Sequence, residues 1–110
     1  MMDEKTKNLI AQFQAYQQQL QTILIQKESL RLQNLEIEKA LEELEKTKEK
    51  KAFKIAGQIM VLKPVEELKK ELKELKENTE LRIKSLEKSE ERISEKLKNL
   101  QKEIKEKVGA

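Results

Sequence analysis

Apolar residues recur every seven positions through the first part of the chain. A second series, offset by four residues, completes an a/d heptad pattern over five repeats. The two series are Leu9, Tyr16, Ile23, Leu30, Ile37 and Leu44, then Phe13, Leu20, Lys27, Asn34 and Leu41. Asp3 is a suitable N-cap, and no Pro or Gly occurs before Gly57. The pattern predicts a coiled-coil helix over residues 3–50, with its end between Thr47 and Ala52.

Apolar residues return to helical spacing after Pro64, a residue type that suits the first position of a helix. They lie three or four residues apart and include Val65, Leu68, Leu72, Leu75, Ile83, Leu86, Ile93, Leu97, Leu100 and Ile104. Thr79 interrupts the apolar series between two consecutive four-residue steps, which resemble a stutter that locally unwinds a supercoil. We therefore expect a second helix over residues 64–108, ended by Gly109.

The stretch between these helices does not follow helical spacing. Phe53 and Ile55 alternate with smaller or polar residues, and 59–62 is an unbroken apolar run of the kind found in strands covered on both faces. Gly57 and Gln58 separate the two runs and suit a tight turn. The pattern predicts a β-hairpin over residues 52–63.

The two helical patterns match each other when one is reversed. In an antiparallel pair the numbers of facing residues have a constant sum, and Leu9 with Ile104 and Phe13 with Leu100 both give 113. Asn34 and Thr79 face each other in this register, where a buried hydrogen bond is expected to fix the pairing. The prediction is a single mainly α domain over residues 1–110: a long antiparallel two-helix coiled coil with one β-hairpin at the bend.

A two-stranded hairpin is marginally stable alone, and the chain offers no other strand to cover it. Its free edges favour pairing with other chains. We therefore interpret it as an element through which several subunits assemble a shared sheet, although it could instead fold back as a loop. The residues assigned to this role are Phe53, Ile55, Gly57, Ile59, Met60, Val61 and Leu62.

The beginning of the first helix is unusual because residues 8–26 carry no charge and include seven glutamines. Uncharged apolar and amide side chains lose little on leaving water, so this end of the helix pair is a candidate contact surface. The residues expected to contact a partner are Leu9, Ile10, Phe13, Leu97, Leu100, Ile104 and Val108. The simpler alternative is a solvated helix face with ordinary seam residues.

Composition narrows the function classes. With 41% charged and 36% hydrophobic residues, the chain has too little apolar material for a compact globule but suits long exposed helices. The net charge of +3 comes mainly from residues 51–63, which hold three lysines and no acid. Both long arms are nearly balanced in charge, which disfavours a nucleic-acid-binding function.

The chain lacks His and Cys, which excludes thiol chemistry, disulfides and the usual zinc sites. The longest apolar run is too short for a membrane span, and no secretory signal follows Met1, so we expect a cytoplasmic protein. Asp3 is the only Asp, and the many Glu residues alternate with Lys as a solvated ion-pair lattice. We expect no enzymatic activity, no cofactor and no metal.

Three segments resemble those of prefoldin, the hexameric chaperone, and in particular its β-type subunit. They are LIAQFQAYQQQLQTI, FKIAGQIMVLK and ENTELRIKSLEKSEERI. The segment KTKEKKAFK differs from the family, which often has Pro or Asp before the first strand. The resemblance implies a subunit with one hairpin, where α-type subunits have two.

The resemblance also implies an assembly and a function. Two α and four β subunits would join their strands into an oligomeric β-barrel, from which the coiled coils extend. Their tips would hold unfolded or nascent polypeptides, prevent aggregation and pass them to a group II chaperonin without ATP. The alternative is a structural coiled-coil adaptor that forms homo-oligomers through its hairpin and binds specific folded partners.

Overall fold

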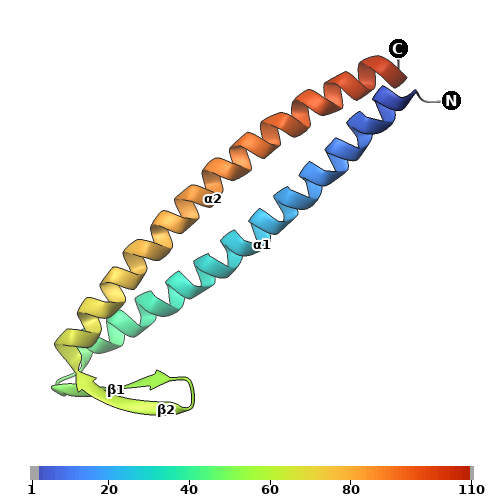
Figure 1. The fold of residues 1–110 in the computed structure, drawn as a ribbon. Helices are drawn as coiled ribbons and strands as arrows, with labels where there is room; N and C mark the ends of the chain where they lie inside the picture. Colours follow the sequence, from blue (N-terminus) through green and yellow to red (C-terminus); the bar gives the residue numbers. More distant parts are fainter. Residues whose placement is uncertain (1–2, 110) are drawn as a thin grey trace. The chain divides into compact units, whose positions relative to one another are not determined.

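Two long helices and a short hairpin make up the chain. The structure is a computed structural model that describes residues 3–109. Along the chain the elements are α1 (Glu4–Lys46), β1 (Lys51–Ala56), β2 (Ile59–Pro64) and α2 (Val65–Val108) (Figure 1). The predicted mainly α fold, with one hairpin between two long helices, is confirmed.

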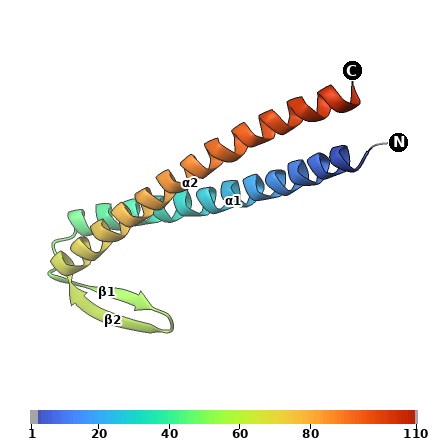
Figure 2. The same ribbon diagram turned by 45° about the horizontal axis from the view of Figure 1, so that its top comes forward.

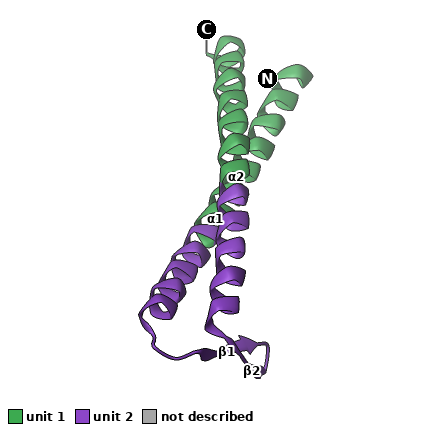
Figure 3. Cartoon of the chain, turned by 90° about the vertical axis from the view of Figure 1, so that its left-hand side faces the viewer, with its two compact units in different colours: residues 1–29, 84–110 green, residues 30–83 purple. Residues whose placement is uncertain are grey.

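The described residues form two compact units. Residues 3–29 and 84–109 make up the first, which we call the terminal unit, and residues 30–83 make up the second, the hairpin unit (Figure 3). Each unit contains a segment of α1 and a segment of α2, and the hairpin unit also contains both strands.

Helix α1 begins as predicted. The backbone N–H of Thr6 donates to Oδ1 of Asp3 at 2.8 Å, and the N–H of Lys7 donates to the Asp3 carbonyl at 3.1 Å. The side chain of Asp3 therefore satisfies a backbone donor that has no partner within the helix. These hydrogen bonds from Thr6 hold the pKa of Asp3 below its ordinary value.

Helix α1 ends at Lys46, so the predicted helix over residues 3–50 was too long. The N–H of Thr47 still donates to the Glu43 carbonyl at 3.1 Å, but Oγ1 of Thr47 accepts from the N–H of Glu49 at 3.2 Å. A threonine hydroxyl that accepts a backbone N–H two residues later offers the chain an alternative to the helix. This local turn leads the chain into β1.

The hairpin has the predicted two-residue turn. Strands β1 and β2 lie side by side and pair in antiparallel register, with Ala56 facing Ile59 (Figure 2). Gly57 occupies the turn with φ of 63°, a conformation that side chains with a Cβ rarely adopt. Gln58 does not share the positive φ, so the turn has Gly at its first central position, as type II′ turns do.

The hairpin is longer than the predicted 52–63, since β1 starts at Lys51 and β2 ends at Pro64. The sequence predicts that Pro64 opens the second helix. Instead, Pro64 belongs to β2 and faces Lys51 at the end of the ladder. Proline cannot donate to a ladder and is tolerated at the end of a strand. Helix α2 begins at Val65, whose N–H donates to the carbonyl of Lys50 at 2.9 Å and closes the base of the hairpin.

The most deeply buried apolar residues described by the structure all belong to the hairpin unit. They are Leu30, Ile37, Val65 and Leu68. Ion pairs flank this core: Lys76 with Glu38 and Lys69 with Glu45, each at 3.6 Å. The residue numbers of both pairs add to 114, so within the hairpin unit the helices are antiparallel and close to the predicted register.

The predicted hydrogen bond between Asn34 and Thr79 is not formed. The hydroxyl of Thr79 donates instead to the carbonyl of Leu75, one turn earlier on the same helix, at 2.8 Å. Oδ1 of Asn34 is buried and has no hydrogen-bond partner. A threonine within a helix readily bonds back to its own backbone, and that local bond has displaced the bond between helices.

Leu75 also departs from its predicted position in the seam. Ile37 of the partner helix is buried, but Leu75 itself is 50% exposed. Each four-residue step overshoots a full helical turn by roughly 40° because an α-helix has 3.6 residues per turn. The two consecutive steps around Thr79 therefore turn Leu75 away from the partner helix.

A cation–π contact and an ion pair join α1 and α2 within the terminal unit. Nζ of Lys96 lies 5.2 Å from the centre of the Tyr16 ring, within the range of a cation–π interaction. Lys27 forms an ion pair with Glu90, and the side chains are 12% and 28% exposed. These contacts connect the two helices within the unit.

Candidate functional site

The hairpin presents large apolar side chains to solvent. The exposed fraction ranges from 39% for Val61 to 73% for Ile55. The exposed set is Phe53, Ile55, Ile59, Met60, Val61 and Leu62. Because neighbouring residues of a strand point to opposite faces, the run 59–62 exposes apolar groups on both faces of β2. Exposed apolar surface of this kind marks an interaction site.

The backbone of the hairpin is also incompletely paired. Strands β1 and β2 pair with each other, and they are the only strands within residues 3–109. Each strand therefore keeps one edge with free N–H and C=O groups, to which a strand of another chain can be added. The residues predicted for assembly, Gly57 at the turn among them, thus lie together on one open element.

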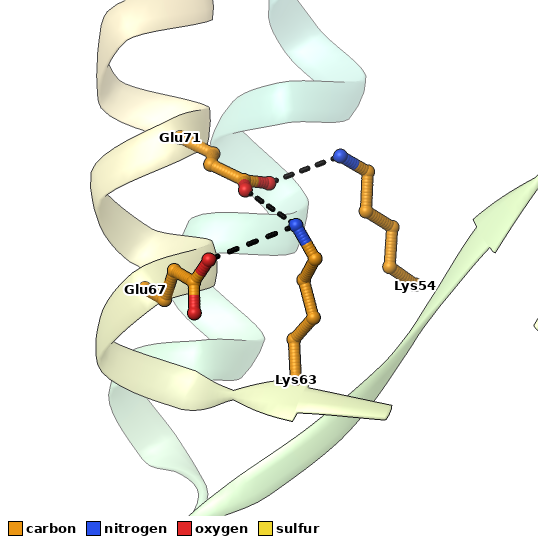
Figure 4. Close-up of polar contacts among 4 residues, drawn as sticks. All are labelled: Lys54, Lys63, Glu67 and Glu71. Atoms are coloured by element: carbon orange, nitrogen blue, oxygen red, sulfur yellow. Dashed lines mark hydrogen bonds and ion pairs between the residues drawn. The ribbon is translucent and has the colours of Figure 1, made fainter. Parts of the chain in front are cut away.

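Glu71 of α2 holds both strands of the hairpin against the helix. It accepts a hydrogen bond from Nζ of Lys63 at 2.7 Å and another from Nζ of Lys54 at 3.0 Å (Figure 4). Lys63 also forms an ion pair with Glu67, one turn earlier on α2, at 3.7 Å. Since Lys54 lies on β1 and Lys63 on β2, one carboxylate orients the whole hairpin.

The pKa values of these groups reflect the same contacts. The hydrogen bond from Lys63, followed by that from Lys54, holds the pKa of Glu71 below its ordinary value. The hydrogen bond to Glu71 raises the pKa of Lys63. Both groups are charged at neutral pH, and their partial exposure means that salt weakens the interaction.

Sequence reasoning missed this charge cluster. Lys63 and Glu67 are four residues apart, a spacing that suggests a contact if both lie on one helix. Lys63 lies on a strand instead, and Lys54 is brought near Glu71 only by the hairpin turn. The one signal in the sequence was the excess of lysine over residues 51–63. The sequence alone did not identify which acidic residues pair with these lysines.

The seven apolar residues predicted for the free end of the helix pair all belong to the terminal unit (Figure 3). Six are half-buried: Leu9, Ile10, Phe13, Leu97, Leu100 and Ile104. Val108 is 58% exposed. Among the described residues of this unit, no apolar side chain is as deeply buried as those of the hairpin unit. The seam of the terminal unit is therefore only partly shielded from solvent.

The uncharged stretch of α1 adds exposed apolar surface to the same unit. Leu24 and Ile25 lie outside the heptad seam and are 42% and 65% exposed. Ile10 also lies outside the seam but is half-buried. Neighbouring glutamines lack charge, so this surface is less costly to desolvate than the lysine-rich and glutamate-rich remainder of the chain.

None of the helices described within residues 3–109 has the length and apolar character needed to cross a membrane. In the same part of the chain, Asp and Glu side chains do not gather in a group of three that could hold a metal ion.

Comparisons with known proteins agree with this geometry. The family model described as prefoldin subunit matches residues 7–110. The prefoldin subunit beta of Archaeoglobus fulgidus is 39% identical over 101 residues, covering 91% of this chain and 87% of the relative. That of Pyrococcus furiosus is 38% identical over 97 residues, covering 87% and 83%.

A solved structure is similar over the full length. The crystal structure of the prefoldin beta subunit from Thermococcus strain KS-1 aligns with a TM-score of 0.87 and 32% identity, covering 100% of this chain and 97% of that one. The arrangement of one hairpin between two long helices is thus shared with that structure. The chain belongs to the prefoldin family of chaperone subunits and, within it, is of the β type.

Proposed function

We propose that this chain is a subunit of an ATP-independent holdase, which binds unfolded or nascent polypeptides and passes them to a group II chaperonin in the cytoplasm. The observation that carries the proposal is the partly exposed apolar seam of the terminal unit. Half-buried side chains from both helices lie beside uncharged glutamine-rich surface there. An unfolded polypeptide exposes apolar segments that can bury this surface.

The contact residues proposed are the predicted set: Leu9, Ile10, Phe13, Leu97, Leu100, Ile104 and Val108. Each residue contributes only a small part of the binding free energy. Burying apolar surface stabilises the complex by about 25 cal/mol per Å², and the partner loses conformational freedom on binding. A single terminal unit therefore binds weakly. Holding needs no nucleotide, since burial of apolar surface itself stabilises the complex.

Assembly converts weak contacts into useful affinity. We propose that the exposed hairpin joins α-type subunits and further β copies, with two α and four β subunits in a hexamer. Several terminal units on one particle then bind one polypeptide, and the second contact forms at a high effective concentration. The exposed apolar residues of β1 and β2 and their free edges support this assembly.

The test of holding is suppression of aggregation. The hexamer with an α-type subunit is mixed with a denatured model protein, and light scattering is followed. Removal of residues 1–12 and 100–110 should abolish most of the protection while the hexamer keeps its assembly. Leu81→Ser, which changes an exposed residue of the other unit, serves as the control. Equal protection after truncation would contradict the assignment of the contact surface.

The test of assembly is the mass of the particle in solution. Light scattering after size exclusion should give a hexamer when the chain is mixed with a two-hairpin α-type subunit. A stable homo-oligomer that needs no second chain and binds one folded partner, without protecting unfolded proteins, would favour the adaptor function instead.

A further inference from the structure

The hairpin unit contains an open groove of about 610 Å³ between β1 and the adjoining ends of the two helices. Its apolar lining comes mainly from Leu44 of α1, Phe53 of β1, and Leu68, Leu72 and Leu75 of α2. The volume lies within the range of roughly 300–1,000 Å³ found for ligand pockets. Phe53 and Leu75 are each at least half exposed, so the fold itself leaves this surface uncovered.

Strand β1 borders the groove with its edge. Three consecutive residues, 52–54, line it, although alternate residues of a strand point to opposite faces. No residue of β2 lines it, and the opposite edge of β1 is the one paired with β2. The free edge of β1 therefore faces the groove. A strand added to that edge would place one row of its side chains over the apolar lining.

Charge indicates what kind of strand fits. Glu43 and Glu74 line the groove from α1 and α2, and neither forms an ion pair within residues 3–109. Glu71 also lines it, but its carboxylate is occupied by Lys54 and Lys63. The groove thus has an apolar floor and two available carboxylates. It is complementary to an extended segment with apolar side chains and at least one basic residue.

We propose that this groove receives a basic apolar β-strand of a neighbouring subunit, so that Leu44, Leu72 and Leu75 of the helices form part of the interface between subunits. The inference rests on the proposed assembly through the hairpin and adds the helices to it. The hairpin of this chain has the required chemistry: residues 51–63 hold three lysines and no acid, and Lys51 is not among the lysines paired with Glu71. Subunits of this type would therefore contact each other through helix as well as strand.

Two pairs of variants test the proposal in the full chain, alone and mixed with an α-type subunit. Leu75→Glu is compared with Leu81→Glu, because both leucines are exposed on α2 and only Leu75 lines the groove. Glu74→Lys is compared with Glu77→Lys, one turn away and outside the groove. Leu75→Glu and Glu74→Lys should raise the dissociation midpoint by about tenfold, and the controls should not. Circular dichroism checks that each variant is folded.

Thiol labelling gives a readout that does not depend on the stability of the variants. The chain has no cysteine, so Leu75→Cys and Leu81→Cys each introduce a single thiol. With a cysteine-free partner, Cys at position 75 should react about tenfold more slowly in the assembly than in the dissociated chain, whereas position 81 should react equally in both.

A third variant separates this proposal from the assembly on which it rests. Val61→Glu alters the hairpin outside the groove. If Val61→Glu prevents assembly while Leu75→Glu assembles normally and the thiol at position 75 stays reactive, the groove proposal is overturned and assembly through the hairpin stands. If wild type does not assemble at all, both are overturned.

Discussion

Lys27 of α1 and Glu90 of α2 form an ion pair across the seam of the terminal unit, at positions where the heptad pattern otherwise places apolar residues. The Lys27 side chain is the more buried of the two, at 12% exposed against 28%. Removing one partner of such a pair leaves a poorly solvated charge, whereas replacing both with apolar groups can be neutral or stabilising.

Glu90→Leu should therefore destabilise the chain by about 1–3 kcal/mol, because the ammonium of Lys27 loses its partner. Lys27→Leu should cost less, since Glu90 is nearer to solvent. The double variant should be at least as stable as wild type. Chemical unfolding at one fixed protein concentration measures the free energies, with Glu91→Leu as the exposed control. Additive effects of the two single variants would contradict the coupling.

Asn34 offers a second stability prediction. Its Oδ1 is buried without a hydrogen-bond partner, and an unsatisfied polar atom costs about 1–3 kcal/mol. Asn34→Leu should raise the free energy of unfolding by about 1 kcal/mol or more, because the polar atom is removed and the space stays filled. Thermal or chemical unfolding is compared with that of Gln33→Leu at an exposed position. A loss of stability would mean that Asn34 has a partner in solution.

At position 57, the stability of the hairpin should depend on whether the residue tolerates a positive φ and not on the size of its side chain. A Cβ there would meet no atom within 4 Å, but the φ of 63° is strained for residues other than Gly. Gly57→Val should destabilise the hairpin by about 1–2 kcal/mol, and Gly57→Asn by less, since Asn tolerates this region. Hydrogen exchange of the β1 and β2 amides reports the difference. Equal protection in both variants would show that the turn has another conformation.

The contact of Glu71 with the hairpin should depend on pH. The folded-state pKa of Glu71 lies below the ordinary value of 4.5, so its stabilising contribution is present above pH 4.5 and is lost as the pH falls through the folded-state value. Lys63 behaves in the opposite sense: its contribution is present below pH 10.5 and is lost as the pH rises through its raised pKa. The hairpin is therefore held against α2 throughout the neutral range.

Carboxyl carbon NMR of Glu71 measures this directly. Lys63→Met should raise the pKa of Glu71 toward its ordinary value, and Lys54→Met should do so by less, because the hydrogen bond from Lys63 is the larger cause. High salt should also raise it. An unchanged titration in Lys63→Met would show that the contact is not formed in solution.

The helices and the hairpin were predictable from the sequence because each follows a simple period. Heptads identify the seam, and Gly57 between two apolar runs identifies the turn. The errors came where a local hydrogen bond decides the outcome. The hydroxyl of Thr47 ended α1 early, and the hydroxyl of Thr79 bonded its own helix instead of Asn34. Periodicity contains no information about such competition.

The exposure of the apolar hairpin residues was predictable, because the sequence predicts no further strand that could cover them. The groove was not, because it depends on Leu75 turning out of the seam and on β1 lying beside both helices. Both facts depend on residues that lie far apart in the sequence. The Glu71 cluster likewise joins two strands and a helix and follows only from their arrangement in space.

The distribution of buried residues makes the stiffness of the chain uneven. Leu30, Ile37, Val65 and Leu68 are buried within residues 30–83. The described apolar side chains of the terminal unit are only partly buried. Segments with few buried contacts open at lower free energy than the rest of a protein. The terminal unit is therefore the more compliant part of the chain, and under the proposed function this compliance would let its contact surface fit polypeptides of different sizes.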